Sequence, residues 1–393
     1  MFRLPCCLVA AVCCCWAPAS LACLWDMDTL VMEREHFPST LELITGKFLR
    51  HSPEYYQWRV EDRVARIEAG EDSPEMYNDL AVAYDKLGQQ DKAIETILAK
   101  DQLHPGLYET YANLGTFYIH GGQFEKGIEQ IDRAIEINPD AHFGREIYQR
   151  LLVEYLLSKR QDEKIVLPLA SDDLRGYSSV GFAEFLREKG MLEVHEEQTK
   201  AQLAKAIKGI LGMMRFGSHD SPILLEALGD LLLAQGNADN SGLLAARAYL
   251  KASYEAKDTS AADAYRQMAK QSLAMREGDE LLAELEAQFR QELDDANQWY
   301  AAVRRDEIGW IAGGKNVDEQ FATKYQSAPQ VIETQSEAER RAALRPSWMS
   351  IALRAFIVVG LILFVGILLF GWFAPARATQ CPSKVRSGKP GRG

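Results

Sequence analysis

The chain has 393 residues and a net charge of −12, and 25% of its residues are charged. This length is enough for a sizeable core and for more than one compact unit. The acidic balance argues against binding to DNA, RNA or anionic lipid, because their phosphates carry the same sign of charge.

Residues 1–22 have the features of a secretory signal peptide. Arg3 gives a positive N-terminal end, residues 4–16 are apolar and uncharged, and small residues precede Cys23. This order predicts export and cleavage after Ala22. A lipid-modified Cys23 and an uncleaved anchor are the alternatives, although Ser20 stands where a bacterial lipoprotein signal carries leucine.

Residues 23–36 gather a cysteine, several carboxylates and a histidine. Such a set can bind a metal ion, so one alternative function is a metal- or thiol-dependent enzyme; its residues would be Cys23, Asp26, Asp28 and His36. However, the carboxylates fall on different sides of any helix, and the sequence has no zinc-binding Cys/His pattern. The favoured interpretation is that Trp25 and Leu30 pin this segment onto the helices that follow.

Residues 23–73 are predicted to form an N-terminal helical cap. Two helices are expected, around residues 41–49 and 54–67. Pro53 suits the first turn of the second helix, since its missing N–H has no partner there in any case. Atypical ends of this kind are typical of helical solenoids.

Residues 74–141 contain two copies of one 34-residue pattern. An aromatic–Leu–Tyr stripe, a glycine and a closing proline recur at identical spacing: Tyr77, Leu80, Tyr84, Gly88 and Pro105, then Tyr111, Leu114, Tyr118, Gly122 and Pro139. The stripe predicts one buried helix face, and the glycine predicts the helix end. Asp91 is expected to cap the second helix, whose inner face would carry Ile94, Ile97 and Leu98.

The pattern resembles the tetratricopeptide repeat family. Two positions depart from the family: Lys100 stands where a small residue is expected, and Gly127 replaces an alanine. The resemblance implies a solenoid of helical hairpins whose first helices line a groove for protein or peptide partners. The positions that face the groove in the family map here to Asn78, Val82, Asp85, Lys86, Ala112, Thr116, Ile119 and His120, with Arg150 from a third hairpin.

Residues 142–325 are expected to continue as helices with a fading repeat. Residues 161–179 suggest an irregular excursion, and residues 182–189 and 193–216 suggest two further helices. Residues 222–258 restore the glycine and leucine spacing and are predicted to form a divergent repeat. A long helix or helix pair over residues 262–306 is expected to pack as a terminal pair.

A run of twenty uncharged residues, Ala355–Ala374, is long enough to span a bilayer as a helix. We therefore predict a linker at residues 326–347, a transmembrane helix at 348–374 and a basic tail at 375–393. The tail has five basic and no acidic residues, which favours a cytoplasmic C-terminus and an exported N-terminal part. Subtracting the +1 of residues 1–22 and the +6 of residues 348–393 leaves −19 on residues 23–347.

The fold class predicted from these features is all-α: a solenoid of tetratricopeptide-like hairpins with additional helices and one C-terminal transmembrane helix. No motif for a nucleophile, a phosphate-binding loop or a metal site is recognised, so no catalytic residue, cofactor or small-molecule substrate is predicted. The whole chain resembles bacterial membrane-anchored tetratricopeptide-repeat proteins. The functional hypothesis is a membrane-tethered scaffold, periplasmic or extracellular, that binds proteins on the exported side.

Overall fold

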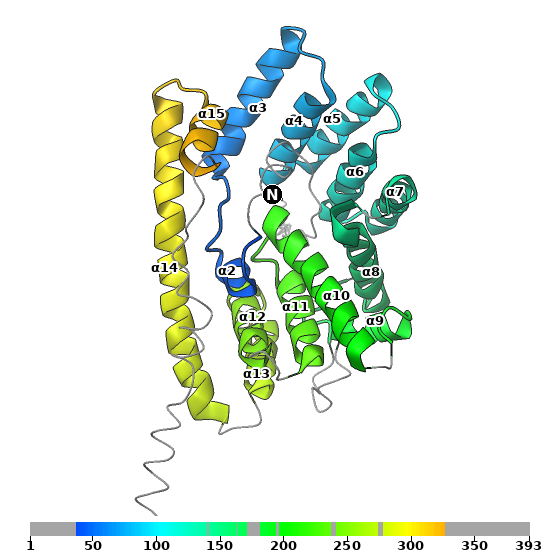
Figure 1. Cartoon of the computed structure of the whole chain (residues 1–393), viewed down its shortest axis with the longest axis vertical. Coiled ribbons are helices and arrows are strands. Elements are labelled where there is room, and N and C mark those ends of the chain that lie inside the picture. The colour runs from blue at the N-terminus through cyan, green and yellow to red at the C-terminus, as the bar shows by residue number, and fades with distance from the viewer. Residues whose placement is uncertain are drawn as a thin grey trace, which may run out of the picture. The chain divides into compact units, whose positions relative to one another are not determined.

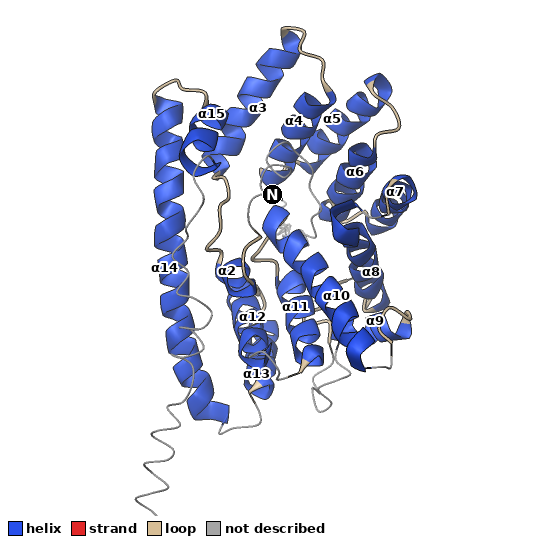
Figure 2. Ribbon diagram, viewed as in Figure 1, coloured by secondary structure: helices blue, strands red, loops and turns tan. Residues whose placement is uncertain are grey.

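The computed structural model describes residues 37–139, 141–162, 164–170, 181–193, 196–236, 241–273 and 278–326. These residues form helices and connecting loops and contain no β-strand (Figures 1 and 2). The chain divides into two units, Met1–Ala328 and Pro329–Gly393, and the second lies outside the described residues. The all-α prediction is confirmed for the part described.

Most of the helices follow one another with short connections, but residues 159–180 separate α8 from α9. Their bounds are α2 Thr40–Thr45, α3 Pro53–Glu68, α4 Pro74–Lys86, α5 Gln90–Leu103, α6 Tyr108–His120, α7 Phe124–Ile137, α8 Arg145–Ser158, α9 Gly181–Glu188, α10 Glu196–Phe216, α11 Pro222–Gln235, α12 Ser241–Glu255, α13 Thr259–Ser272, α14 Gly278–Ala312 and α15 Val317–Phe321. A 3-10 turn, Ala141–Gly144, precedes α8, and a π-helical turn, Ala322–Gln326, follows α15. The expected first cap helix is shorter than predicted, because Gly46 takes a left-handed conformation at φ 79° and ends it.

The two predicted repeats are the hairpins α4–α5 and α6–α7. Gly88 and Gly122 have φ angles of 73° and 74°, and the residue after each donates its N–H back into the first helix. Glycine suits this left-handed turn because it has no Cβ. Each first helix therefore ends at the same place in its repeat, and the second helix folds back against it.

Two details of the repeat prediction are wrong. Asp91 lies inside the first turn of α5, whose N-cap is Gln89 and has no side-chain cap. A carboxylate in the first turn still interacts favourably with the helix dipole. Leu98 is 41% exposed, whereas Ile94 and Ile97 are buried, so the inner face of α5 is narrower than the apolar pattern indicates.

The predicted divergent repeat is the hairpin α11–α12, whose helices pack closely. A Cβ on Gly229 would lie 2.6 Å from the ring of Tyr249, so only glycine admits this tyrosine. α13 continues the stack on α12, while α10 packs between α8 and α11. One large apolar cluster joins α2 with helices from α6 to α14. A smaller cluster joins α4, α5 and α6, and a third joins α10, α14 and α15.

The last long helix, α14, closes the first unit upon itself. It packs against α13 and α12 and also against α2 and α3, so it joins the end of the stack to its beginning (Figure 1). The helix pair expected over residues 262–306 corresponds to α13 and α14. However, α14 does more than pack on α13, because it also contacts α2 and α3 at the start of the stack. Within the described ranges no helix combines the length and apolar character that crossing a bilayer requires, and residues 348–374 lie outside those ranges.

Candidate functional site

Polar side chains join the first helices of successive hairpins. Asn113 donates to Asn78 at 3.5 Å, His120 Nδ1 lies 2.8 Å from a carboxylate oxygen of Asp85, and Gln149 donates to the Thr116 hydroxyl at 3.1 Å. We call this surface of α4, α6 and α8 the first-helix face. Its residues come from equivalent places in adjacent hairpins, so the helical repeat itself aligns them.

Seven of the nine residues predicted to line a partner groove are buried. The exposed fractions of these seven residues are Asn78 3%, Val82 1%, Asp85 6%, Ala112 2%, Thr116 0%, Ile119 0% and His120 5%. Lys86 and Arg150 are partly exposed. The structure thus brings the predicted set together on neighbouring first helices, but most of it is enclosed within the chain.

Arg150 lies in a salt-bridge network. Its guanidinium pairs with Asp132 at 2.6 Å and with Glu154 at 3.1 Å, and 37% of its side chain is exposed. Its charge is therefore partly compensated within the chain.

Lys100 contributes a cation to the first-helix face from the second helix of its hairpin. Its Nζ donates to Asn78 at 2.9 Å and lies 3.8 Å from Glu109, and the residue is fully buried. Burial lowers the pKa of this lysine, while Glu109 opposes the shift. The sequence marked Lys100 as a departure from the repeat, but spacing alone gave no indication of its partners.

Three cations from different helices meet at Phe216, at the end of α10. Lys86 donates to the carbonyl oxygens of Phe216 and Gly217 at 2.7 and 2.6 Å. The guanidinium carbons of Arg145 and Arg215 lie 5.0 and 5.1 Å from the centre of the Phe216 ring. We call Lys86, Arg145, Arg215 and Phe216 the Phe216 centre. Lys86, Arg145 and the adjacent pair Arg215 and Phe216 are far apart in the sequence, so no local pattern predicts this cluster.

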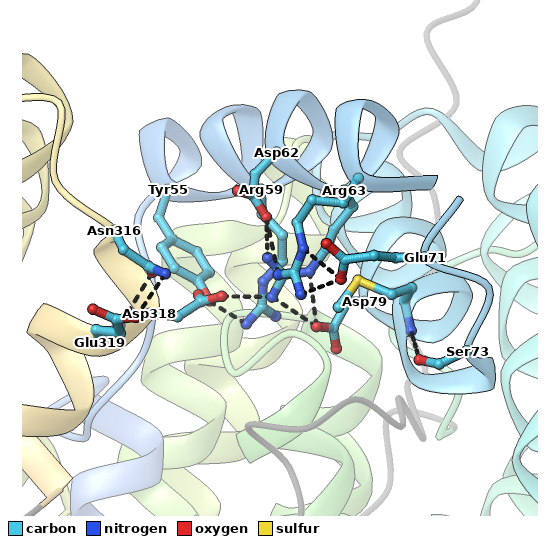
Figure 3. Close-up of polar contacts among 12 residues, drawn as sticks. Tyr55, Arg59, Asp62, Arg63, Glu71, Ser73, Asp79, Asn316, Asp318 and Glu319 are labelled. Atoms are coloured by element: carbon cyan, nitrogen blue, oxygen red, sulfur yellow. Dashed lines mark hydrogen bonds and ion pairs between the residues drawn. The ribbon is translucent and has the colours of Figure 1, made fainter. Parts of the chain in front are cut away.

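A second polar network joins the start of the stack to its end (Figure 3). Arg63 of α3 donates to Asp79 of α4 at 3.1 and 2.8 Å and also pairs with Asp318 of α15. Asp318 further accepts hydrogen bonds from Tyr55 at 2.7 Å and Arg59 at 3.3 Å. We call these five residues the closure network. Arg59, Arg63 and Asp79 are all buried, so their charges depend on one another for compensation.

Two fully buried carboxyl groups one turn apart on α11 form a third cluster. Glu226 accepts the backbone N–H groups of Leu169 and Ala170 at 3.0 and 2.7 Å, and the Tyr265 hydroxyl at 2.6 Å. Asp230 accepts the Phe182 N–H at 2.8 Å and the Tyr249 hydroxyl at 2.7 Å. These groups serve as backbone anchors for the chain on either side of residues 171–180.

The residue types that can ligate a metal do not cluster in the described part of the chain. Within it no group of three or more His, Cys, Asp or Glu side chains is arranged to hold a metal ion. The alternative enzyme hypothesis used Cys23, Asp26, Asp28 and His36, which all lie outside the described ranges.

Comparison with known proteins agrees with this geometry. The family model of the tetratricopeptide repeat matches residues 74–99 and 108–141. The chain is also similar to small glutamine-rich tetratricopeptide repeat-containing protein 2 of Mycosarcoma maydis, with 26% identity over 73 residues. That stretch is 19% of this chain and 21% of the relative, so the likeness is confined to about a fifth of each.

Fold and comparison together define an α-helical repeat protein built from stacked hairpins. Over residues 74–141 the hairpins are tetratricopeptide repeats, as the sequence predicted. Repeats of this family generally mediate protein–protein interaction.

Proposed function

We propose that this chain is a membrane-tethered scaffold that binds protein partners on the exported side of the membrane. The observation that carries the proposal is the pair of tandem tetratricopeptide repeats at residues 74–141. A stack of hairpins offers an extended surface made of many helices, which suits recognition of a peptide or a partner helix. Protein binding is therefore the activity that this architecture serves best.

The first-helix face is the proposed partner surface. It combines hydrogen-bonding side chains, such as Asn78 and Thr116, with the partly exposed cations Lys86 and Arg150. Because most of this face is buried, the partner is expected to reach it only when part of the chain moves aside. The exposed edge at Arg150 is the place where contact would begin.

The tether rests on sequence features alone. The apolar run at residues 355–374 has the length of a bilayer-spanning helix, and the basic tail after it favours a cytoplasmic C-terminus. The signal-like residues 1–22 favour export of the helical unit. The acidic character of residues 23–347 suits soluble partners with basic or neutral surfaces better than nucleic acids.

Crosslinking in intact cells, followed by purification of the full chain, tests the scaffold proposal. We expect a reproducible partner whose recovery falls in the variants Asn78→Ala and Arg150→Glu. Arg133→Glu on α7 is the matched control, because the Arg133 side chain is 50% exposed; it forms an ion pair with Glu129 of the same helix at 3.0 Å and lies over the ring of Tyr111. A complete absence of partners, or a partner recovered equally from all variants with unchanged thermal stability, would contradict the proposed surface.

A further inference from the structure

The long helix α14 is held in different ways along its two halves. Its first half carries Leu282, Leu285 and Phe289, which are buried in the main apolar cluster together with residues of α12 and α13. The guanidinium of Arg247 on α12 also donates two hydrogen bonds to Glu292, at 2.8 and 2.9 Å. Apolar burial and this ion pair therefore anchor the first half of α14 on the stack.

The second half of α14 has few buried apolar residues. In residues 294–312, all of which the structure describes, the buried apolar side chains are those of Ala296 and Val303. Val303 belongs to the small apolar cluster that joins α10, α14 and α15, with partly buried residues such as Trp299 around it. Because hydrophobic stabilisation follows the apolar area buried, this half is held less firmly by apolar contacts than the first half.

Polar contacts join the second half of α14 to the start of the stack. Glu307, which is fully buried, lies 2.6 Å from His51 Nδ1 and accepts the Ser52 N–H at 2.9 Å. At the rim Arg304 pairs with Glu54, and 49% and 35% of their side chains are exposed. α15 adds the contacts of the closure network (Figure 3). Separation would return these groups to water and recover their hydration, so a polar junction opens more readily than an apolar one.

The two halves of α14 meet at a sequence that lowers the cost of bending. Residues 294–297 read Asp-Asp-Ala-Asn. Asp and Asn have low helix propensity, because their short polar side chains compete for backbone hydrogen bonds. A bend at this point would move the second half of the helix without disturbing the contacts of Phe289 and Glu292.

Movement of the second half would affect the Phe216 centre. The Phe216 ring shares the small apolar cluster with Val303 and Phe321, and Lys86 of α4 donates to the Phe216 carbonyl oxygen at 2.7 Å. Lys86 is one of the partly exposed residues of the first-helix face. Displacement of α15 and the end of α14 would therefore remove part of the cover at this end of the face.

We propose that residues 294–326, which comprise the second half of α14, α15 and the turn after it, form a strap that opens away from α2 and α3. The first half of α14 stays packed on α12 and α13 during this movement. The closed strap covers the Phe216 centre, and its opening makes this end of the first-helix face accessible. The link to a partner rests on the proposed function, but the opening belongs to the chain alone and is measured without a partner.

Thiol alkylation of the full chain measures the opening. Val303→Cys places a thiol at the junction, and Val153→Cys makes the same exchange on α8 in the main apolar cluster; both valines are buried. Mass spectrometry of the digested chain separates these sites from the native cysteines, and each rate is divided by that of the same variant unfolded in urea. We expect Val303→Cys to react about tenfold faster or more, since opening of the strap suffices to expose it. Equal rates would overturn the proposal, because the junction would then open only with the whole unit.

Charge variants at the rim separate opening of the strap from general instability. In the Val303→Cys background, Arg304→Glu should raise the alkylation rate about three- to tenfold, because attraction to Glu54 becomes repulsion. Adding Glu54→Arg should restore the original rate. Arg305→Glu is the matched control: Arg305 is the next residue of the same helix and is exposed, and the change should alter the rate by less than about twofold.

No response to Arg304→Glu, or an equal response to Arg305→Glu, would overturn the strap. Failure to capture a partner would instead contradict the proposed function, and the alkylation rates would remain as expected.

Discussion

Lys100 occupies a position where the repeat pattern favours a small residue. Its long side chain is accommodated because Nζ reaches Asn78 of the first helix at 2.9 Å, with Glu109 of the next repeat nearby. A buried ammonium group destabilises the fold unless it is paired. Here the side-chain amide of Asn78 and the carboxylate of Glu109 both interact with it. Lys100 therefore links two repeats by polar contacts at a position where the family pattern predicts only apolar packing.

The buried carboxyl groups on α11 make stability depend on pH. Burial and the neighbouring Asp230 raise the pKa of Glu226 to about 8, and burial raises that of Asp230 to about 6. A carboxyl group whose pKa is higher in the folded than in the unfolded chain contributes stability below its unfolded pKa and loses it as the pH rises through the folded pKa. The contribution of this pair should therefore decline between about pH 4 and pH 8.

Urea unfolding at several pH values measures this decline. In the variant Glu226→Gln the slope of unfolding free energy against pH should become shallower. At low pH, where the native carboxyl is protonated, the variant should be less stable, because one backbone N–H loses its acceptor. Glu319→Gln is a suitable control, since Glu319 is exposed on α15. A slope unchanged by Glu226→Gln would show that this group does not titrate as described.

At the scale of elements, the second repeat is packed more tightly than the first. A Cβ on Gly127 would lie 2.4 Å from Ile119 and 3.0 Å from the Gly115 carbonyl oxygen, and a Cβ on Gly115 would lie 3.0 Å from the Gly127 carbonyl oxygen. The backbones of α6 and α7 thus cross at two facing glycines. The first repeat has Ala81 and Ala93 at the corresponding places. This explains the departure at Gly127, which the sequence showed without giving its reason.

The variant Gly127→Ala should therefore lower the free energy of unfolding, even though it restores the residue usual in the family. The clash should cost more than the gain in helix propensity, leaving a net loss of about 1–2 kcal/mol. Gly309→Ala in α14 should instead add about 0.5–1 kcal/mol, because a Cβ there meets nothing within 4 Å. Chemical denaturation of both variants checks the pair; a stabilised Gly127→Ala protein would contradict the close crossing.

The hairpins could be predicted because their signals are local. Tyr77, Gly88 and Pro105 each act within one repeat, so their spacing determines where helices begin, end and fold back. The course of α14 could not be predicted in this way. An apolar stripe such as Leu282, Leu285 and Phe289 shows which face is buried, but it does not reveal which helix covers that face.

For the whole first unit, closure of the stack is the dominant feature. α14 contacts α2 and α3, and α15 contacts α3 through Asp318, so residues about 250 positions apart in the chain are joined. Besides the closure network, His51 Nδ1 lies 2.6 Å from Glu307, and the Ser52 N–H donates to the same carboxylate at 2.9 Å. The family pattern implied an open groove, but in this fold residues such as Val82 and Thr116 are enclosed. Burial of this kind depends on tertiary contacts between distant segments, so the spacing of the repeats does not predict it.

The closure network should stabilise the contact between α3 and α15. Asp318→Asn removes the charge that faces Arg59 and Arg63 while keeping the side-chain volume. We expect a loss of about 1–3 kcal/mol in unfolding free energy, because two buried guanidinium groups lose a charged acceptor. Glu319→Gln, next to it in the chain, should change stability by less than about 0.5 kcal/mol. Hydrogen exchange in α3 should increase only in Asp318→Asn; equal exchange in both variants would contradict this role.

We propose that the helical unit is an exported scaffold held at a membrane. Protease treatment of intact cells, combined with the mass of the mature N-terminus, tests it most directly. If the unit is exported, we expect a chain that begins at Cys23, a helical unit released by cleavage within residues 326–347, and a fragment with residues 348–374 retained in the membrane. A chain that keeps Met1, with its repeats protected from the external protease, would contradict the claim and place the scaffold on the cytoplasmic side.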